Sequence, residues 1–546
     1  MLVSQVLRSL FVLAAAWILR FSYRFYKNRR WFKDLPKPPH SFLWGHLKLM
    51  GEIAATLPPN VHPQHMATAI AKMYNLSGIF YLDMWPIADS MIILTDPDLM
   101  SKVAVNMALP IHPLAEEVLR PIVGKNVIAG VNGALWKKSH KAMAPAFSWS
   151  HVRNMSPVMV DECLTFQKTL DRYADSGEVF SMVNEGGKLI FDVIARLVFN
   201  FSLHAQTEGS QDLEDLKAMV GLAEAALSWD PILKLKTFLP RRRIFNRLQI
   251  SIGGKIRERL ALLREGKIVP SRKDPHSILD LMLREHVEEH AAGKDTNEVK
   301  LPKAYTEMVT TNLKGLLVGG HSTTNDTLCY ALMLLSKSPS AITKLRAEHD
   351  LVFSPSPSET LSILSDNPSK LDELEYTTAV IRETLRLFPI GFTVRQAPAG
   401  AKLEYKGAHL PLHQPGTRLT ISPNPQGLHY DPAYFPDPSS FNPDRFTDPQ
   451  TAQAARANMR TFGRGARACL GQNLALDELR VVLLMVGRGW EFECVGLQGR
   501  GEGKGRMEWL SELEMVFGDV VFQELGLSAG VRGEMGMRVR KVDRET

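Results

Sequence analysis

One cysteine near the carboxyl end of the chain lies among residues that could make it reactive. The segment FGRGARACLG, residues 462–471, places Cys469 between glycines and arginines. Glycines permit tight turns and let a flat ligand approach the backbone closely. The following residues have a helical pattern, so the sulfur would lie just before a helix N-terminus, where amide groups stabilise negative charge. With the nearby arginines favouring ionisation, the segment predicts an activated thiolate, either a nucleophile or a metal ligand.

The remaining cysteines and the charge narrow the class of protein. The four cysteines, Cys163, Cys329, Cys469 and Cys494, are scattered without a CxxC pair. This argues against a disulfide framework and a structural zinc site and favours a reducing compartment. The net charge of +7 is spread over 546 residues, with no basic stripe interleaved with aromatic residues. We therefore expect no nucleic-acid binding, and a membrane surface or an acidic protein partner suits the charge better.

The elements that must position Cys469 are mainly helical. Apolar residues recur three and four apart from about Trp44 onward, and the longest such stretch is Leu301–Ser336. Short alternating runs at Gly78–Met84 and Ser90–Asp96 predict a small sheet, and Glu534–Val542 predicts a closing hairpin. The fold class is therefore mainly α with a small β part.

The first residues of the chain predict a membrane anchor. Leu2–Leu19 is largely apolar, although its uninterrupted part, Leu10–Leu19, is shorter than the roughly 20 residues that a span needs. Arg8 can snorkel towards the interface, which lengthens the usable stretch. A cleaved signal peptide is the alternative. An uncleaved anchor is favoured because Trp17 and a basic flank follow the alanines; the flank comprises Arg20, Arg24, Lys27, Arg29 and Arg30.

The anchor sets the expected division of the chain. The positive-inside rule keeps the residues after the basic flank in the cytosol. The prolines of LPKPPH, residues 35–40, predict a stiff extended hinge. We expect an anchor and basic flank at 1–30, a proline-rich hinge at 31–43 and one large domain at 44–546.

The cysteine segment resembles the haem-binding signature of the cytochrome P-450 family. Its pattern, FxxGxRxCxG, is matched at every fixed position by Phe462, Gly465, Arg467, Cys469 and Gly471. The resemblance implies the cytochrome P-450 fold, with a long central helix over haem b and Cys469 as the axial ligand of the iron. It also places Phe462, Gly463, Arg467 and Gly471 around that cofactor.

Two further segments resemble the same family. ETLR, from Glu383 to Arg386, matches its ExxR motif, and FNPDRF contains Arg445 at the position of a third partner. Alone, a carboxylate and a guanidinium three residues apart are a common solvated pair. The resemblance implies a buried network of Glu383, Arg386 and Arg445 in which each partner is needed for a folded haem pocket, since an incomplete buried ion network is costly.

The segment GGHSTT, Gly319 to Thr324, resembles the oxygen-binding motif of the family. Two glycines inside a helix cost about 1 kcal/mol each relative to alanine, so they need a reason: a packing notch, or a widened turn that admits dioxygen. Thr323 falls on the oxygen-binding threonine, and Ser322 replaces the usual acid. The resemblance makes Thr323 and Ser322 the catalytic residues, but serine passes a proton without supplying a charge. The bland alternative for Thr323 is a hydrogen bond to a carbonyl of its own helix.

The resemblance also implies a set of residues that bind the haem propionates. WKKSHK contains Trp136 and places His140 where the family usually has arginine, which makes a weaker, pH-dependent partner. Arg467 and Arg395 match the remaining arginines. Three lysines beside this element predict either a docking face for an acidic electron donor or a plain solvated helix face: Lys137, Lys138 and Lys141.

The activity implied by the resemblance is that of a haem-thiolate monooxygenase. The chain shows no dinucleotide-binding GxGxxG unit, so electrons from NADPH would come through NADPH–cytochrome P-450 reductase. The implied location is the endoplasmic reticulum membrane, with a single span and the haem domain facing the cytosol.

The segments that would form the substrate walls are mainly apolar and predict a hydrophobic small-molecule substrate. They are Leu109–Gly124, Ala223–Leu235, the stretch before Gly319, and Pro389–Val394. Within the family, the sequence most resembles membrane-bound fungal members that oxidise polyketides or terpenoids in secondary metabolism. A sterol or fatty-acid hydroxylase is the alternative. Two alternatives lie outside the monooxygenases. One is a haem-thiolate isomerase or dehydratase that needs no reductase, and the other is a non-catalytic haem sensor.

Overall fold

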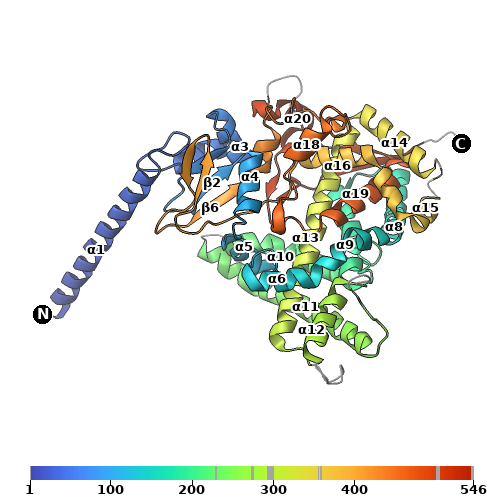
Figure 1. Ribbon diagram of the computed structural model, residues 1–546, viewed down its shortest axis with the longest axis horizontal. Coiled ribbons are helices and arrows are strands. Elements are labelled where there is room, and N and C mark those ends of the chain that lie inside the picture. The colour runs from blue at the N-terminus through green and yellow to red at the C-terminus, as the bar shows by residue number, and fades with distance from the viewer. Residues whose placement is uncertain are drawn as a thin grey trace.

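The computed structural model describes residues 2–227, 230–271, 276–291, 300–354, 356, 359–499 and 505–542. Helices dominate, and the small sheet of residues 79–82, 90–94 and 419–423 lies on the side of the body from which the first helix projects (Figure 1). This confirms the fold class expected from the spacing of apolar residues.

The helices of the first half of the chain are α1 (Leu2–Trp31), α2 (Leu47–Thr56), α3 (Pro63–Met73), α4 (Pro97–Ser101), α5 (Leu114–Val123), α6 (Gly133–Met143), α7 (Trp149–Asn154), α8 (Ser156–Ser176), α9 (Met182–Phe199), α10 (Gln211–Leu227) and α11 (Pro231–Arg264). Those of the second half are α12 (Ile278–Ala291), α13 (Lys303–Ser336), α14 (Pro339–Phe353), α15 (Thr360–Asp366), α16 (Glu375–Leu387), α17 (Pro425–His429), α18 (Ala452–Asn458), α19 (Gln472–Gly487) and α20 (Ser511–Phe517).

Helix α13 runs through the middle of the body (Figure 1). Its 34 residues correspond to a length of about 50 Å. It begins at Lys303, two residues later than predicted, because Pro302 has an extended backbone and marks the start of the helix. Side chains on several of its faces, such as Val309, Leu317 and Leu328, are buried, and α9, α16 and α19 all contact it.

The predicted strands near the start of the chain are confirmed. β1 (Ile79–Leu82) and β2 (Ser90–Leu94) pair antiparallel, and β6 (Leu419–Pro423) adds in parallel to β2. A separate two-stranded sheet contains β4 (Lys402–Tyr405) and β5 (Ala408–Pro411).

The hairpin expected at the carboxyl end is wrong. β10 (Gly536–Lys541) pairs antiparallel with β7 (Trp490–Cys494) and with the short β3 (Phe180–Ser181), both far away in the sequence. The alternation that buries Met537 and Val539 correctly predicts a strand, but alternation alone does not identify the strand with which it pairs. The remaining short pair is β8 (Glu524–Leu525) with β9 (Ala529–Gly530).

Helix α1 projects from the body and extends past the boundary expected at residue 30 (Figure 1). Its first part carries exposed apolar side chains, and Gln5–Trp31 is long and apolar enough to cross a membrane. Its last turns pack onto the body instead: Asn28 and Arg29 are buried, and both donate hydrogen bonds to the carboxylate of Asp83. The end of α1 is thus part of the folded body.

The proline-rich segment after α1 is packed rather than free. Phe32 and Pro38 are buried, and the amide of Tyr81 on β1 donates to the carbonyl oxygen of Pro36 at 2.8 Å. The prolines keep this segment extended, and the contact with β1 fixes its direction relative to the small sheet.

Candidate functional site

The loop around Cys469 is held by its own backbone. The amide of Cys469 donates to the carbonyl of Phe462 at 2.8 Å, and α19 begins three residues later, as predicted. Gly463 and Gly465 have φ angles of +69° and +76°, which favour glycine. A Cβ atom at Gly465 would also lie 2.9 Å from the carbonyl oxygen of Ala104. The turn that presents the sulfur therefore depends on these two glycines.

The thiol of Cys469 is accessible, and the protein atoms around it do not favour the thiolate. Burial among protein atoms raises its pKa, and a hydrogen bond with the backbone of Gly471 only partly offsets this. The expectation that neighbouring arginines favour the thiolate is wrong for the protein alone, because the guanidinium of Arg467 is directed to Val131, Asn132 and the ring of Trp136. A bound metal ion removes the proton of a coordinating thiol outright, so the site favours a metal ligand over a free nucleophile.

Arg467 is packed against the residues expected to share its role. Its guanidinium carbon lies 4.2 Å from the centre of the Trp136 ring on α6, and the rings of Trp136 and His140 are 4.9 Å apart. It also donates to the carbonyl of Val131 at 2.7 Å and to the side chain of Asn132 at 3.0 Å. The structure thus brings Trp136, His140 and Arg467 together.

Arg395 completes a cationic group without an acidic partner. It donates to the carbonyl of Leu109 at 3.0 Å, while its buried Nε atom has no hydrogen-bond partner among the described residues. Burial lowers the pKa of Arg467, and the charge of Arg395 lowers it further. Neither guanidinium forms a salt bridge within the described part of the chain. Two neighbouring cations of this kind fit an anionic ligand.

The two glycines of α13 lie in different surroundings, which give different reasons for the absence of a side chain. A Cβ atom at Gly320 would lie 2.7 Å from the side chain of Ile194 on α9, so this glycine is a packing notch. A Cβ atom at Gly319 would meet no atom within 4 Å. α13 is continuous through both positions, so it shows no widened turn. The open side at Gly319 leaves room beside the helix instead.

Both hydroxyls expected to act in catalysis bond to carbonyls of their own helix. Thr323 Oγ1 donates to Gly319 at 2.7 Å, and Ser322 Oγ donates to Val318 at 3.1 Å. Sequence reasoning missed a carboxyl group on the same helix: Asp326 is buried three residues after Thr323, and burial raises its pKa to about 7. The sequence does place Asp326 three residues after Thr323, a spacing that puts both side chains on one face of a helix, and this could have identified it.

The network of Glu383, Arg386 and Arg445 forms as the motifs imply. Arg386 donates two hydrogen bonds to the Glu383 carboxylate, at 2.7 and 2.8 Å, and Arg445 donates a third at 3.2 Å. Glu383 and Arg386 are fully buried. Both guanidiniums also donate to backbone carbonyls of residues 429–440, so the network fixes the segment that leads towards the cysteine loop.

His429 is a second residue that sequence reasoning missed. Its Nε2 atom accepts the amide of Arg460 at 3.2 Å, and its Nδ1 atom lies 3.1 Å from the carbonyl oxygen of Arg386. Burial lowers its pKa to about 3, so the ring is neutral and Nδ1 carries the proton. His429 therefore ties the ion network to the residues just before Phe462. His429 begins HYDP, residues 429–432, a segment that resembles the family, and this resemblance could have identified it.

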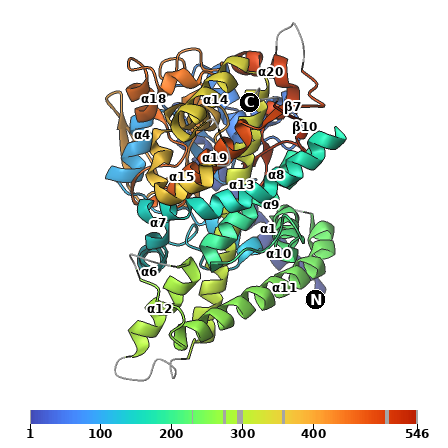
Figure 2. The ribbon, with the colours of Figure 1, turned by 90° about the vertical axis from the view of Figure 1, so that its right-hand side faces the viewer.

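The basic face expected on α6 is partly neutralised. Lys138 lies 3.0 Å from Glu289, and Lys141 lies 3.4 Å from Glu285, both on α12. Helix α12 contacts α6 and projects with α11 from the rest of the body (Figure 2). These exposed pairs leave Lys137 as the lysine of the three without a salt bridge among the described residues.

Comparison with known proteins agrees with this geometry. The family model for cytochrome P450 matches residues 36–500, and the chain belongs to the cytochrome P450 family. It is 28% identical over 505 residues to cytochrome P450 monooxygenase acrF of Aspergillus aculeatus, covering 89% of this chain and 99% of that protein. It is 27% identical over 492 residues to cytochrome P450 monooxygenase polC of Polytolypa hystricis, covering 88% and 87%.

The fold is also that of a solved member. The crystal structure of the cytochrome P450DA heme domain superposes with a TM-score of 0.69 at 19% identity, covering 93% of this chain and 98% of that chain. The chain is a cytochrome P450 monooxygenase, and its family implies haem. The residues present fit that cofactor, because an accessible thiol, an open helix face at Gly319 and two unpaired arginines suit the metal, the flat ring and the acidic groups of haem.

Glu383→Gln is expected to prevent stable holoprotein formation. It removes the one negative charge between two buried arginines, and breaking a buried ion network in this way costs about 3–5 kcal/mol. The measurement is haem content and unfolding temperature of the purified protein. Glu375→Gln, an exposed residue on the first turn of the same helix, is the control and is expected to behave as wild type. A Glu383→Gln protein with wild-type haem content and stability would contradict the role of the network.

Arg395→Gln is expected to speed haem loss by roughly tenfold, since a charged hydrogen bond of the cationic group is removed. Transfer of haem to excess apomyoglobin measures this rate without reference to activity. Arg464→Gln is the matched control, because Arg464 is exposed in the cysteine loop and bonds only to the carbonyl of Ala457 among the described residues. Equal rates for Arg395→Gln and wild type would exclude Arg395 from haem binding.

Proposed function

We propose that this monooxygenase oxidises a hydrophobic small molecule of fungal secondary metabolism, of the polyketide or terpenoid class, with Cys469 as the axial ligand of haem b. The observation that carries the proposal is the accessible Cys469 thiol, presented by a glycine turn just before α19. When bound, haem supplies the activation of dioxygen, of which one atom enters the substrate and the other leaves as water.

The residues around the cofactor have distinct parts in this proposal. Phe462, Gly463 and Gly471 shape the turn beside the sulfur. Trp136, His140, Arg395 and Arg467 bind the propionates, and the contact between Arg467 and Trp136 pre-orients them. His140 stands where the family usually has arginine, so an imidazole replaces a guanidinium at this contact.

The proton route is proposed to run through Thr323 and Ser322 on the open side of α13. Each hydroxyl donates to a helix carbonyl and leaves its oxygen lone pairs free to accept a proton; rotation of the O–H bond away from the carbonyl then releases the original proton to the next acceptor. Ser322 carries no charge, and the buried carboxyl of Asp326 is the nearest acid along the helix with a pKa suited to proton exchange at neutral pH.

The substrate class is supported by the walls expected from the sequence. Leu109–Gly124 contains α5, whose residues Ile122 and Val123 are buried, and Pro389–Val394 includes buried Ile390 and half-exposed Phe392. Ser228 and Trp229 of the wall segment Ala223–Leu235 lie outside the described residues. Apolar walls with few charges favour a lipid-soluble substrate. The fungal monooxygenases named above support secondary metabolism over sterol or fatty-acid oxidation.

Membrane attachment and electron supply complete the proposal. The long apolar helix α1 is proposed as a single span in the endoplasmic reticulum membrane, with the catalytic body in the cytosol. Exposed apolar side chains at the start of α11, such as Leu235 and Leu239, support contact with the bilayer. Electrons are proposed to come from NADPH through NADPH–cytochrome P-450 reductase.

The test combines two measurements on the full-length protein. Reduced protein exposed to carbon monoxide should show the red-shifted absorption band of thiolate ligation, and Cys469→Ser should abolish it. With reductase and NADPH under heavy-isotope dioxygen, lipid-soluble metabolites extracted from the producing organism should yield a product carrying one heavy oxygen atom. Product formed without dioxygen or reductase would instead indicate an isomerase or dehydratase.

Ser322→Asp is expected to raise the share of NADPH oxidation that yields product, by about twofold, because a carboxyl group supplies protons more readily than a hydroxyl. The measurement is the ratio of product to NADPH consumed, with Ser322→Ala as the control that removes the hydroxyl without adding an acid. An unchanged ratio in Ser322→Asp would show that this position does not limit proton delivery.

A further inference from the structure

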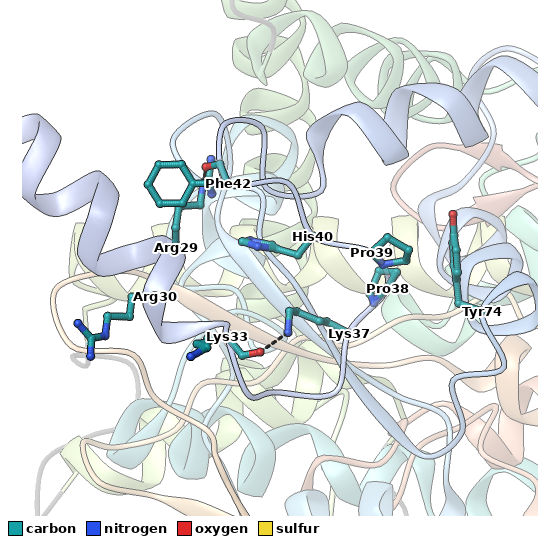
Figure 3. A pocket seen from close by; sticks show the side chains of 9 residues that line it. All are labelled: Arg29, Arg30, Lys33, Lys37, Pro38, Pro39, His40, Phe42 and Tyr74. Atoms are coloured by element: carbon teal, nitrogen blue, oxygen red, sulfur yellow. Dashed lines mark hydrogen bonds between the residues drawn. The ribbon is translucent and has the colours of Figure 1, made fainter.

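An open pocket with a basic rim lies where α1 meets the body (Figure 3). It has a volume of about 700 Å³ and is lined by the end of α1, the proline-rich segment and Tyr74. This volume is within the range of sites that bind small molecules. The pocket lies outside the cysteine loop and outside the residues assigned above to haem or substrate.

The charge of the pocket is positive and mostly uncompensated. Arg29 and His40 both contact the carboxylate of Asp83, so these two side chains already have an acidic partner. Arg30, Lys33 and Lys37 form no salt bridge among the described residues, and Arg30 donates only to the hydroxyl of Tyr26. The pocket thus presents three cations, with exposed Asp34 as the nearby acid that acts on Lys37.

Lys37 is positioned by the backbone of the pocket. Its Nζ atom donates to the carbonyl of Lys33 at 2.6 Å and to that of Leu35 at 3.3 Å (Figure 3). An ammonium group has three protons, so one remains for a ligand. Partial burial lowers the pKa of Lys37, and an anion beside it would offset that effect.

A tight loop beside the pocket carries three exposed apolar residues in a row. Phe42, Leu43 and Trp44 have exposed fractions of 59%, 62% and 52%. Ser41 and Gly45 close the loop by exchanging two backbone hydrogen bonds, at 3.0 and 2.8 Å. A rigid loop that holds large apolar side chains out to solvent is typical of a surface that enters a membrane interface.

Aromatic residues of α1 and of the loop contact one another, so both segments would lie at the same depth in a membrane. Phe25 of α1 contacts Phe42 at 5.6 Å, and Phe21 stacks on both Trp17 and Trp85. Aromatic clusters of this kind mark the boundary between hydrocarbon and headgroups. Arg29 follows Phe25 by one turn, or about 6 Å along the helix, which matches the thickness of one headgroup layer, about 5–8 Å. The basic pocket is therefore at headgroup depth.

We propose that this pocket binds the headgroup of an anionic phospholipid, with Arg30, Lys33 and Lys37 around the phosphate and the Phe42–Trp44 loop against the acyl chains. The proposal rests on the membrane anchoring proposed above. A free phosphate would use the cations but not the exposed apolar loop. An acidic protein would not need the pocket to continue from the membrane span.

The test uses the full-length holoprotein in nanodiscs of phosphatidylcholine with a minority of phosphatidylserine. After mild detergent extraction and purification, the phosphatidylserine retained per protein is measured. Each basic residue near an anionic surface is worth roughly fivefold in affinity, so Lys33→Gln/Lys37→Gln should reduce retention by about tenfold or more. Lys33→Gln alone should reduce it less, and because its side chain is exposed, folding should be unaffected. Lys303→Gln, an exposed lysine at the start of α13, is the matched control.

Competition identifies the ligand. Short-chain phosphatidylserine should displace the retained lipid at concentrations at which short-chain phosphatidylcholine and inorganic phosphate do not. Equal displacement by inorganic phosphate would overturn the proposal in favour of a free-anion site. Unchanged lipid retention in the double variant would also overturn it, and a concurrent loss of reductase-supported NADPH oxidation would point to an acidic protein. Failure of wild type to enter nanodiscs would instead refute the membrane anchor.

Discussion

The buried carboxylate of Glu383 between two guanidiniums is the constraint on which the site depends. Arg386 and Arg445 cannot stay buried without this charge, and their remaining protons are satisfied by carbonyls of residues 429–440. His429 continues the connection to the amide of Arg460. One ion network therefore fixes the chain that enters the cysteine loop, so the position of the sulfur follows from electrostatics far from the sulfur itself.

The backbone of the cysteine loop positions the Cys469 thiol but does not favour its ionisation. Positive φ angles at Gly463 and Gly465 and the hydrogen bond from Cys469 to Phe462 present the thiol, while burial keeps its pKa high. A coordinating metal ion would remove this proton on binding. Arg395 and Arg467 form no salt bridge among the described residues and repel each other. An anionic ligand would relieve this repulsion, so these two arginines also favour binding of an acidic cofactor.

The end of α1 is joined to the catalytic body more firmly than a flexible hinge would allow. Asn28 and Arg29 are buried against Asp83, and the proline-rich segment hydrogen-bonds to β1. A rigid junction sets the orientation of the body relative to α1.

Sequence alone determined what local patterns can encode. The apolar spacing gave α13 within two residues, alternation gave β1 and β2, and five fixed residues of one segment identified Cys469. Only the tertiary structure decided the contacts between distant segments: β7 as the partner of β10, Glu285 and Glu289 as partners of the α6 lysines, and Ile194 as the reason for Gly320. It also reversed the expected ionisation of Cys469, because desolvation and the direction of Arg467 depend on packing that no local pattern contains.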